Sequence, residues 1–127
     1  MSLSVLLENE FVHVGSWRTV DCLPHKAAWL KYQPGLYAFV VGSTVMYVGR
    51  ATVLHRRLRN YSRRAFRDEK RALRSAHTNI ALSVATAVEV VVYAKIAPGA
   101  NEVLLDPLET DLIRSFQPAW NGTHGIR

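Results

Sequence analysis

Two β-type runs separated by two residues constrain the fold of this chain more than any other feature. Residues 35–41 (GLYAFVV) and 44–48 (TVMYV) are rich in aromatic and β-branched side chains, which are enriched in strands. Gly42 and Ser43, between the two runs, suit a two-residue turn. The sequence therefore predicts a β-hairpin over residues 35–48.

A helix is expected directly after the hairpin. Leu54, Leu58 and Tyr61 recur at helical spacing and give an apolar stripe beside a strongly basic face. Thr52 precedes them, and threonine is one of the residue types that cap helix N-termini. The basic pattern continues over residues 66–75, where we expect a second helix or an extension of the first.

One more strand and one more helix complete the predicted domain. Residues 84–93 are dense in valine and fit a buried central strand, which Pro98-Gly99 ends. A final helix is expected over residues 101–116, or over residues 106–116. The order hairpin, helix, strand, helix predicts an α+β fold with a small central antiparallel β-sheet of three strands flanked by helices.

Residues 1–30 form a poorly patterned leader, in which residues 11–14 (FVHV) could add a fourth strand to the sheet. A chain of 127 residues is about right for one compact domain and too short for two. We therefore expect the leader to pack on, or to extend, one domain that spans residues 31–127.

The charge balance narrows the class of partner. The formal net charge is +6 and the isoelectric point is near 9.9, while 49% of the residues are apolar and can build a core. Such a basic domain favours a polyanionic partner, which can be DNA, RNA or an anionic membrane surface.

Several other classes of protein are excluded. The most apolar run, residues 80–97, contains Glu89 and Lys95 and falls short of the ~20 residues that a membrane span needs. The N-terminus lacks a basic start followed by a long apolar stretch, so we expect a cytoplasmic protein. Cys22 is the only cysteine, which excludes an intramolecular disulfide and a cysteine-based metal cluster.

The hairpin carries two tripeptides at a fixed distance from residues that follow. The first tripeptide is Gly35-Leu36-Tyr37, and the second is Tyr47-Val48-Gly49. Their tyrosines are ten residues apart. Arg57 lies eight residues after the second tripeptide, and Tyr61 follows one helical turn later on the same face. Either tripeptide alone would carry no information, whereas the complete set does.

The last predicted helix adds the remaining residues of this set. Glu109 opens the run ETDLIRSFQPAWN, and Asn121 closes it twelve residues later. Over roughly residues 31–121 the pattern resembles the GIY-YIG nuclease superfamily, and within it most closely the N-terminal nuclease domains of bacterial UvrC excision-repair proteins. The resemblance implies the GIY-YIG fold and a metal-dependent endonuclease that hydrolyses phosphodiester bonds in DNA.

The resemblance also implies the role of each main residue. Glu109 is expected to hold one divalent ion, Mg²⁺ or Mn²⁺, since these ions bind through few carboxylates and keep several waters. Arg57 is expected to stabilise the charge on the scissile phosphate through its forked donors. Tyr37 is the first candidate for the base that activates water, and Tyr47 is the second.

Three further residues are expected to support the site. Arg50 stands where related domains often carry lysine, so a phosphate-binding role is expected, because arginine does not deprotonate. Tyr61 stands where some homing-endonuclease relatives carry histidine, which leaves its acid–base role open. Asn121 is expected to anchor the active-site face by hydrogen bonds. The basic residues expected to grip DNA phosphates are Arg50, Arg56, Arg59, Arg63 and Arg64.

Each of these assignments has a structural alternative. The two hairpin tyrosines can simply pack a sheet, and Arg57 can belong to a solvated basic helix face. Asp106, Pro107 and Glu109 together suit a capping box, in which backbone amides would satisfy the Glu109 carboxylate. Asn121 and Gly122 can form an ordinary turn.

At the level of function, two alternatives remain open. One is a catalytically inactive nucleic-acid-binding module of the same fold, and the other is an unrelated basic structural protein. Since no sequence-reading module is recognisable beside the nuclease pattern, a protein partner or a homodimer could direct the enzyme to its target.

Overall fold

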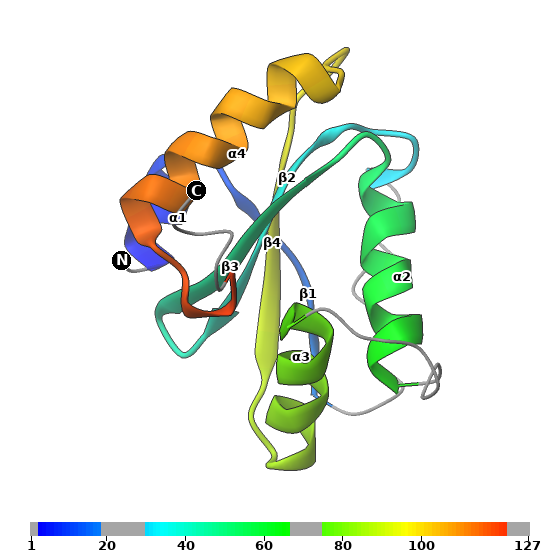
Figure 1. The fold of residues 1–127 in the computed structure, drawn as a ribbon, viewed down its shortest axis with the longest axis vertical. Helices are drawn as coiled ribbons and strands as arrows, with labels where there is room; N and C mark the ends of the chain where they lie inside the picture. Colours follow the sequence, from blue (N-terminus) through cyan, green and yellow to red (C-terminus); the bar gives the residue numbers. More distant parts are fainter. Residues whose placement is uncertain (1–2, 19–29, 67–74, 122–127) are drawn as a thin grey trace.

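A four-stranded antiparallel sheet forms the centre of the molecule (Figure 1). The computed structural model describes residues 3–18, 30–66 and 75–121. The strand order is β1-β4-β2-β3, which confirms the predicted α+β fold with a central antiparallel sheet. The strands are β1 (Val12–Trp17), β2 (Gly35–Val41), β3 (Thr44–Ala51) and β4 (Val90–Ile96).

The fourth strand comes from the N-terminal leader, as predicted. It pairs antiparallel with β4, from Val12 opposite Ala94 to Trp17 opposite Val90. Because β1 covers one side of β4 and β2 covers the other, the valine-rich β4 lies inside the sheet.

Helices cover both faces of the sheet (Figure 1). One face carries α1 (Leu3–Glu8) and α4 (Glu102–Phe116), and the other carries α2 (Leu54–Phe66) and α3 (Ser75–Ala85). The α2/α3 face buries the predicted apolar stripe of Leu54, Leu58 and Tyr61. Among the described residues, no helix is long and apolar enough to cross a membrane.

The predicted hairpin is confirmed, with one irregularity that matters for the site. Gly42 has a φ of +64° at the turn, a conformation in which glycine meets no Cβ penalty. Tyr47 pairs with Phe39, but Val45 pairs with the residue next to Phe39, so Met46 is an extra residue on β3. Side chains alternate along a strand, so this β-bulge turns Tyr47 to the face that Phe39 occupies.

The start of the predicted valine-rich strand is wrong. Strand β4 begins at Val90, and Val84 instead belongs to the last turn of α3. Ile80 and Val84 are four residues apart, and both pack against the α2/α3 core from the helix. Ala87, with a φ of +62°, then reverses the chain before the strand begins.

The α4 helix also differs from one of the predicted alternatives. Asn101 is its N-cap, and the Asn101 side chain accepts a hydrogen bond from the Leu104 amide at 3.0 Å. The capping box at Asp106 is therefore wrong, because Pro107 lies inside the helix and Glu109 follows in its middle. The Glu109 carboxylate is therefore not part of a helix cap.

The start of α2 is displaced from the predicted cap. The helix begins at Leu54, two residues after Thr52, and the Leu54 amide donates to the carbonyl of Gln33 at 2.9 Å. Most of the expected helical extension over residues 66–75 lies outside the described residues.

Candidate active site

Tyr37 and Gly49 explain why the two tripeptides occur together. Tyr37 lies on the central strand β2 with only 1% of its surface exposed. A Cβ placed on Gly49 would lie 2.3 Å from Cζ of Tyr37 and 2.4 Å from its hydroxyl oxygen. The glycine of the second tripeptide therefore makes the space in which the phenol of the first tripeptide lies.

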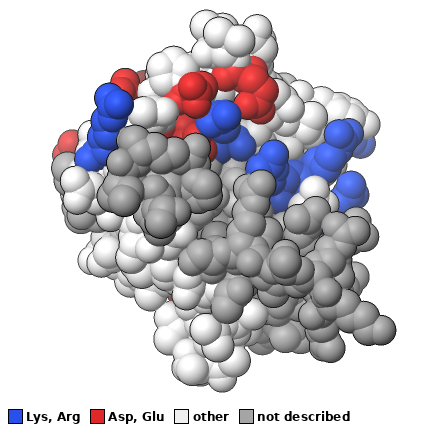
Figure 2. All heavy atoms as spheres, viewed as in Figure 1, with Lys and Arg blue, Asp and Glu red and all other residues white. Residues whose placement is uncertain are grey.

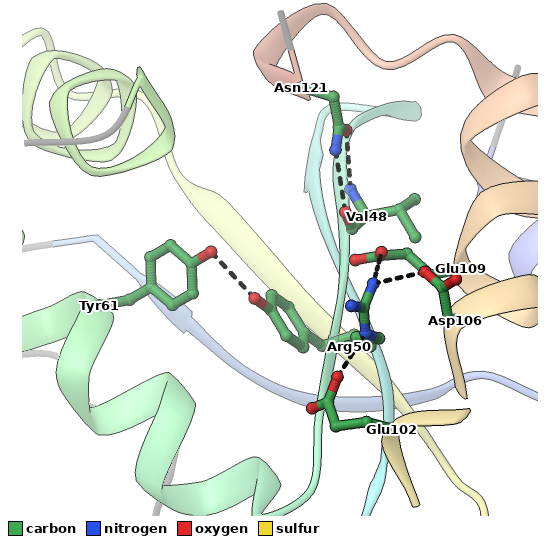
Figure 3. Close-up of polar contacts among 8 residues, drawn as sticks. Val48, Arg50, Tyr61, Glu102, Asp106, Glu109 and Asn121 are labelled. Carbon is green, nitrogen blue, oxygen red and sulfur yellow. Dashed lines mark hydrogen bonds and ion pairs between the residues drawn. The ribbon is translucent and has the colours of Figure 1, made fainter. Parts of the chain in front are cut away.

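A tyrosine cluster, formed by Tyr37, Tyr47 and Tyr61, lies between the sheet and α2. The hydroxyl groups of Tyr37 and Tyr61 share a hydrogen bond of 2.9 Å (Figure 3). The ring centroid of Tyr47 lies 6.2 Å from that of Tyr37 and 6.1 Å from that of Tyr61. The bulge in β3 and the helical spacing of α2 thus bring together three phenols that are far apart in sequence.

Arg57 adds a positive charge to this cluster. It lies one helical turn before Tyr61 on α2, and its side chain is partly buried. Burial lowers the pKa of Arg57, but the neighbouring phenols of Tyr37 and Tyr61 outweigh that effect and raise it. The guanidinium is therefore a permanent cation beside the phenol hydroxyls.

Burial dominates the ionisation of the phenols. It raises the pKa of Tyr37 well above that of a free tyrosine, and nearby Tyr47 adds to the rise, whereas Arg57 and the hydrogen bond from Tyr61 oppose it. Burial likewise raises the pKa of Tyr61, followed by the effects of Tyr37 and Tyr47. Both phenols are therefore neutral at physiological pH.

Arg50 points to the opposite side of the sheet, toward α4 (Figure 3). Its Nε donates to Glu102 at 2.8 Å, and its Nη1 contacts both Asp106, at 3.1 Å, and Glu109. The hydrogen bond to Glu102 raises the pKa of Arg50 further, against the lowering effect of burial. Arg50 is thus an ion-pair partner of three carboxylates and does not extend the basic face of α2.

Glu109 is the least exposed of these carboxylates and lies within electrostatic reach of the tyrosine cluster. Its side chain is 15% exposed, and its negative charge contributes to the raised pKa of Tyr37. Glu109 and Tyr37 come from opposite faces of the sheet, so the charge of Glu109 acts on the phenol across the sheet.

Asn121 supports the β3 edge of the sheet. Its side-chain oxygen accepts from the Val48 amide at 3.1 Å, and its side-chain nitrogen donates to the Val48 carbonyl at 3.0 Å. Because β3 is an edge strand, the amide side chain takes the place of a further strand at Val48. Val48 is the middle residue of the second tripeptide.

The residues at this edge fit a divalent cation held by one carboxylate. No group of three or more histidine, cysteine, aspartate or glutamate side chains in the described ranges is arranged to hold a metal. Glu109 is instead a single hard oxygen donor with some exposure, and Mg²⁺ is commonly bound through one or two carboxylates plus waters and phosphate oxygens.

The structure brings most of the predicted site residues together. Tyr37, Tyr47, Tyr61 and Arg57 form one group, and Glu109 with Arg50 lies at the neighbouring edge. Of the residues expected to bind DNA, Arg56 and Arg59 are exposed on α2, whereas the side chains of Arg63 and Arg64 lie outside those described. Figure 2 shows Lys and Arg side chains gathered over α2, and acidic side chains over α4, on the same face of the molecule.

Two residues of the site were not predicted. Glu102 and Asp106 hold Arg50 together with Glu109. The signal was present, because positions 102, 106 and 109 share one face of a helix. The alternative in which Asp106 caps the helix hides this signal, because it places the helix start after Glu102.

The sheet, the tyrosine cluster and the carboxylate at the β3 edge define a domain of the GIY-YIG class. A family model described as the UvrC-like GIY-YIG domain matches residues 33–122. The chain therefore belongs to the UvrC-like GIY-YIG family of nuclease domains.

Comparisons with individual proteins agree with this family. UvrABC system protein C of Natronomonas pharaonis is 34% identical over 96 residues, which are 76% of this chain and 14% of that protein. The chain thus spans about one seventh of the length of this curated relative.

The solved structures that match include one bacteriophage protein and one bacterial endonuclease domain. A mutant of EndoII of bacteriophage T4 shares the fold with a TM-score of 0.71 and 18% identity, over 93% of this chain and 96% of that chain. The N-terminal endonuclease domain of UvrC from Thermotoga maritima, bound to magnesium, gives a TM-score of 0.46 and 22% identity, over 72% of this chain and 85% of that chain.

Proposed function

We propose that this domain is a divalent-metal-dependent endonuclease that hydrolyses phosphodiester bonds in DNA. The observation that carries the proposal is that the Tyr37 phenol lies within electrostatic reach of both a guanidinium, Arg57, and a carboxylate, Glu109. Tyr37 is hydrogen-bonded to Tyr61. The charge of Arg57 lowers the pKa of Tyr37, and the charge of Glu109 raises it. Membership of the UvrC-like GIY-YIG family supports the same reaction.

Glu109 would hold the metal, Mg²⁺ or Mn²⁺, through its carboxylate. When bound, such an ion would supply Lewis-acid polarisation of a phosphate oxygen and stabilise negative charge in the transition state. Glu109 can serve this role because it is fixed on the middle of α4 and is not committed to a helix cap.

Arg57 would bind the scissile phosphate. Its guanidinium carries a permanent charge and can donate two parallel hydrogen bonds to phosphate oxygens. Negative charge grows on these oxygens as water attacks phosphorus and the bond to the leaving oxygen breaks. A cation held in place by α2 stabilises that charge without having to reorganise.

Tyr37 is our first candidate for the group that takes the proton of the attacking water, and Tyr47 is the second. A neutral phenol is a poor base, and burial makes ionisation of Tyr37 still less favourable. Additional positive charge beside Glu109 would favour the phenolate, and Tyr61 would stabilise it by donating its hydroxyl proton in the hydrogen bond of 2.9 Å.

A second candidate function is a non-catalytic DNA-binding module. The ion pair between Arg50 and Glu109 favours it, because it occupies the carboxylate that a metal would need. Under this alternative the exposed Arg56 and Arg59 would bind DNA phosphates, and a partner protein or a second copy would direct the domain to its target.

Cleavage of supercoiled plasmid and of a labelled single strand tests the proposal, with Mg²⁺, Mn²⁺ or EDTA present. We expect metal-dependent cutting by the native chain. Glu109→Gln and Arg57→Gln should each slow it about 10²-fold or more, the size of effect seen when a group that stabilises the transition state is removed. Single-turnover rates measured with excess enzyme provide the readout.

Matched controls come from the same part of the fold. Asp111→Asn and Arg114→Gln change an exposed carboxylate and an exposed cation of α4, and both should cut at the native rate. Binding of DNA without any cutting, unaffected by EDTA or by Glu109→Gln, would support the binding module instead.

A further inference from the structure

Arg50 is held in a pocket of negative charge that α4 presents to the edge of the sheet. Arg50 pairs with Leu36 across the two hairpin strands, so both side chains point to the α4 face. Glu102, Asp106 and Glu109 recur at i, i+4 and i+7 on the helix and meet the guanidinium there (Figure 3). We call Arg50 and these three residues the carboxylate clamp.

The contacts of the clamp are not equivalent. The side chain of Glu109 is 15% exposed, whereas those of Glu102 and Asp106 are 56% and 62% exposed. The Arg50 side chain is 30% exposed. The contact between Arg50 and Glu109 is therefore the shielded one, and the other two contacts lie in water at the rim.

The clamp also holds an excess of negative charge. Three carboxylates face a single guanidinium, so the ion pairs leave the cluster attractive to a further cation. That cation cannot use the full Glu109 carboxylate while Arg50 Nη1 donates to it.

We propose that Arg50 is the resident counter-ion of Glu109, which a divalent cation displaces, and that Glu102 and Asp106 retain the displaced guanidinium beside the site. This inference rests on the proposed metal-binding role of Glu109. Rotation of the Arg50 side chain toward the rim suffices for the exchange, since Nε already donates to Glu102 and Nη1 already contacts Asp106.

The proposal assigns two functions to the clamp. In the absence of metal, Arg50 neutralises a partly buried carboxylate, which would otherwise be costly. In the presence of metal, Arg50 stays near the cation as a positioning residue, and the rim carboxylates offset the repulsion between the two. Lysine cannot do both, because an ammonium is a point charge without the fork that reaches several carboxylates at once.

Binding of Mn²⁺ to the DNA-free protein tests the inference independently of cleavage. Titration with Mn²⁺, followed by the electron paramagnetic resonance signal of the free ion, gives the dissociation constant. We expect Arg50→Gln to bind Mn²⁺ about tenfold more tightly than the native chain, the size of effect expected for the loss of one charge-assisted contact that competes with it. Arg50→Lys should bind Mn²⁺ with an affinity between those of the native chain and Arg50→Gln. Arg114→Gln, which removes an exposed cation from α4, should match the native chain.

The retention step is tested by a second set of variants. The double change Glu102→Gln with Asp106→Asn should weaken Mn²⁺ binding more when residue 50 is arginine than when it is glutamine. The additional weakening in the arginine background arises because the displaced guanidinium then has no other carboxylate in the clamp to contact. Equal weakening in both backgrounds would mean that the rim residues act only through their charge, which would overturn the retention step.

The outcomes separate this inference from the proposed function. Metal-dependent cleavage together with equal Mn²⁺ affinities of the native chain and Arg50→Gln would overturn the counter-ion role alone. Absence of Mn²⁺ binding in every variant, together with absence of cleavage, would overturn the nuclease function and the inference with it. Thermal unfolding of each variant shows whether a changed affinity reflects a folded protein.

Discussion

At the scale of single residues, the site depends on a glycine as much as on its reactive groups. Tyr37 can reach Tyr61 because Gly49, on the neighbouring strand, has no side chain where the phenol lies. Gly35, in the other tripeptide, has a similar role, since a Cβ there would lie 2.1 Å from the carbonyl oxygen of Lys95. The glycines of the two tripeptides are therefore explained by close packing, and neither needs a positive φ.

Gly49→Ala is expected to destabilise the fold and to displace Tyr37. The added methyl group would overlap Cζ of Tyr37, and overpacking of a core typically costs about 1–3 kcal/mol. Denaturant unfolding measures the change in free energy. Gly42→Ala is the control, because a Cβ at Gly42 meets nothing within 4 Å and only the positive φ opposes it, a cost of about 1 kcal/mol. An unchanged unfolding free energy in Gly49→Ala would contradict the packing role of Gly49.

At the scale of secondary-structure elements, the edge strand β3 carries the second tripeptide and needs protection. Within the part of the chain that the structure describes, no strand pairs with its outer side. The two hydrogen bonds of Asn121 to Val48 supply a local substitute, so the C-terminal end of the described chain closes over the middle of this tripeptide. The same strand presents Arg50 to α4, which makes β3 the element on which both halves of the site depend.

Asn121→Asp is expected to loosen β3 at Val48. A carboxylate can still accept from the Val48 amide, but it cannot donate to the Val48 carbonyl, and leaving a buried acceptor unpaired costs about 1–3 kcal/mol. Hydrogen exchange of the Val48 amide and the unfolding free energy are the two measurements. Asn9→Asp, at an exposed residue directly after α1, is the control; it should leave the exchange of the Val48 amide unchanged and the unfolding free energy within about 0.5 kcal/mol of the native value.

Sequence patterns predicted the elements that have a strong local signal. The hairpin and α2 follow from strand composition and from the spacing of Leu54 and Leu58, and both are confirmed. Helices α1 and α3 were not predicted as separate elements, because a six-residue helix has little periodicity and the valine near the end of α3 continues into a valine-rich run that is typical of a strand. Val84 shows the difficulty, since only the packed sheet decides whether a valine ends a helix or begins a strand.

The candidate site was predictable in part for a different reason. The selection of Tyr37, Arg57 and Glu109 follows from a residue spacing that resembles that of a known family. Such a spacing reflects the fold as a whole. The ion pair of Arg50 with Glu109 does not follow, because it depends on which face of β3 turns toward α4. That orientation results from the bulge at Met46, an irregularity without a clear sequence signal.

At the scale of the whole molecule, charge is divided between two helices on one face. Acidic residues of α4 enclose Arg50, while Arg56 and Arg59 on α2 remain exposed and have no ion pair with a described carboxylate (Figure 2). A polyanion would therefore meet attraction over α2 and repulsion over α4. The net charge of +6 alone does not reveal this division.

The salt dependence of DNA binding is expected to report this division. If Arg56 and Arg59 each contact a phosphate, then Arg56→Gln and Arg59→Gln should each reduce the slope of log affinity against log salt by about 1. Arg114→Gln, on α4, should leave the slope unchanged. Filter binding of one duplex over a salt series, in EDTA to prevent cutting, measures all three slopes. An equal effect at Arg114 would show that attraction is spread over the whole surface.

Strand β1 has a consequence for anyone who wishes to transplant this catalytic unit into another protein. The family match begins at residue 33, yet β1 pairs with β4 and places Trp17 against Phe39 and Tyr61, with ring centroids 5.1 and 6.5 Å apart. A graft limited to the matched segment would leave β4 with an open, valine-rich edge, which invites intermolecular pairing. It would also remove the indole that backs the tyrosine cluster. The portable module is thus larger than the segment that similarity outlines, and a chimera should carry β1 along with it.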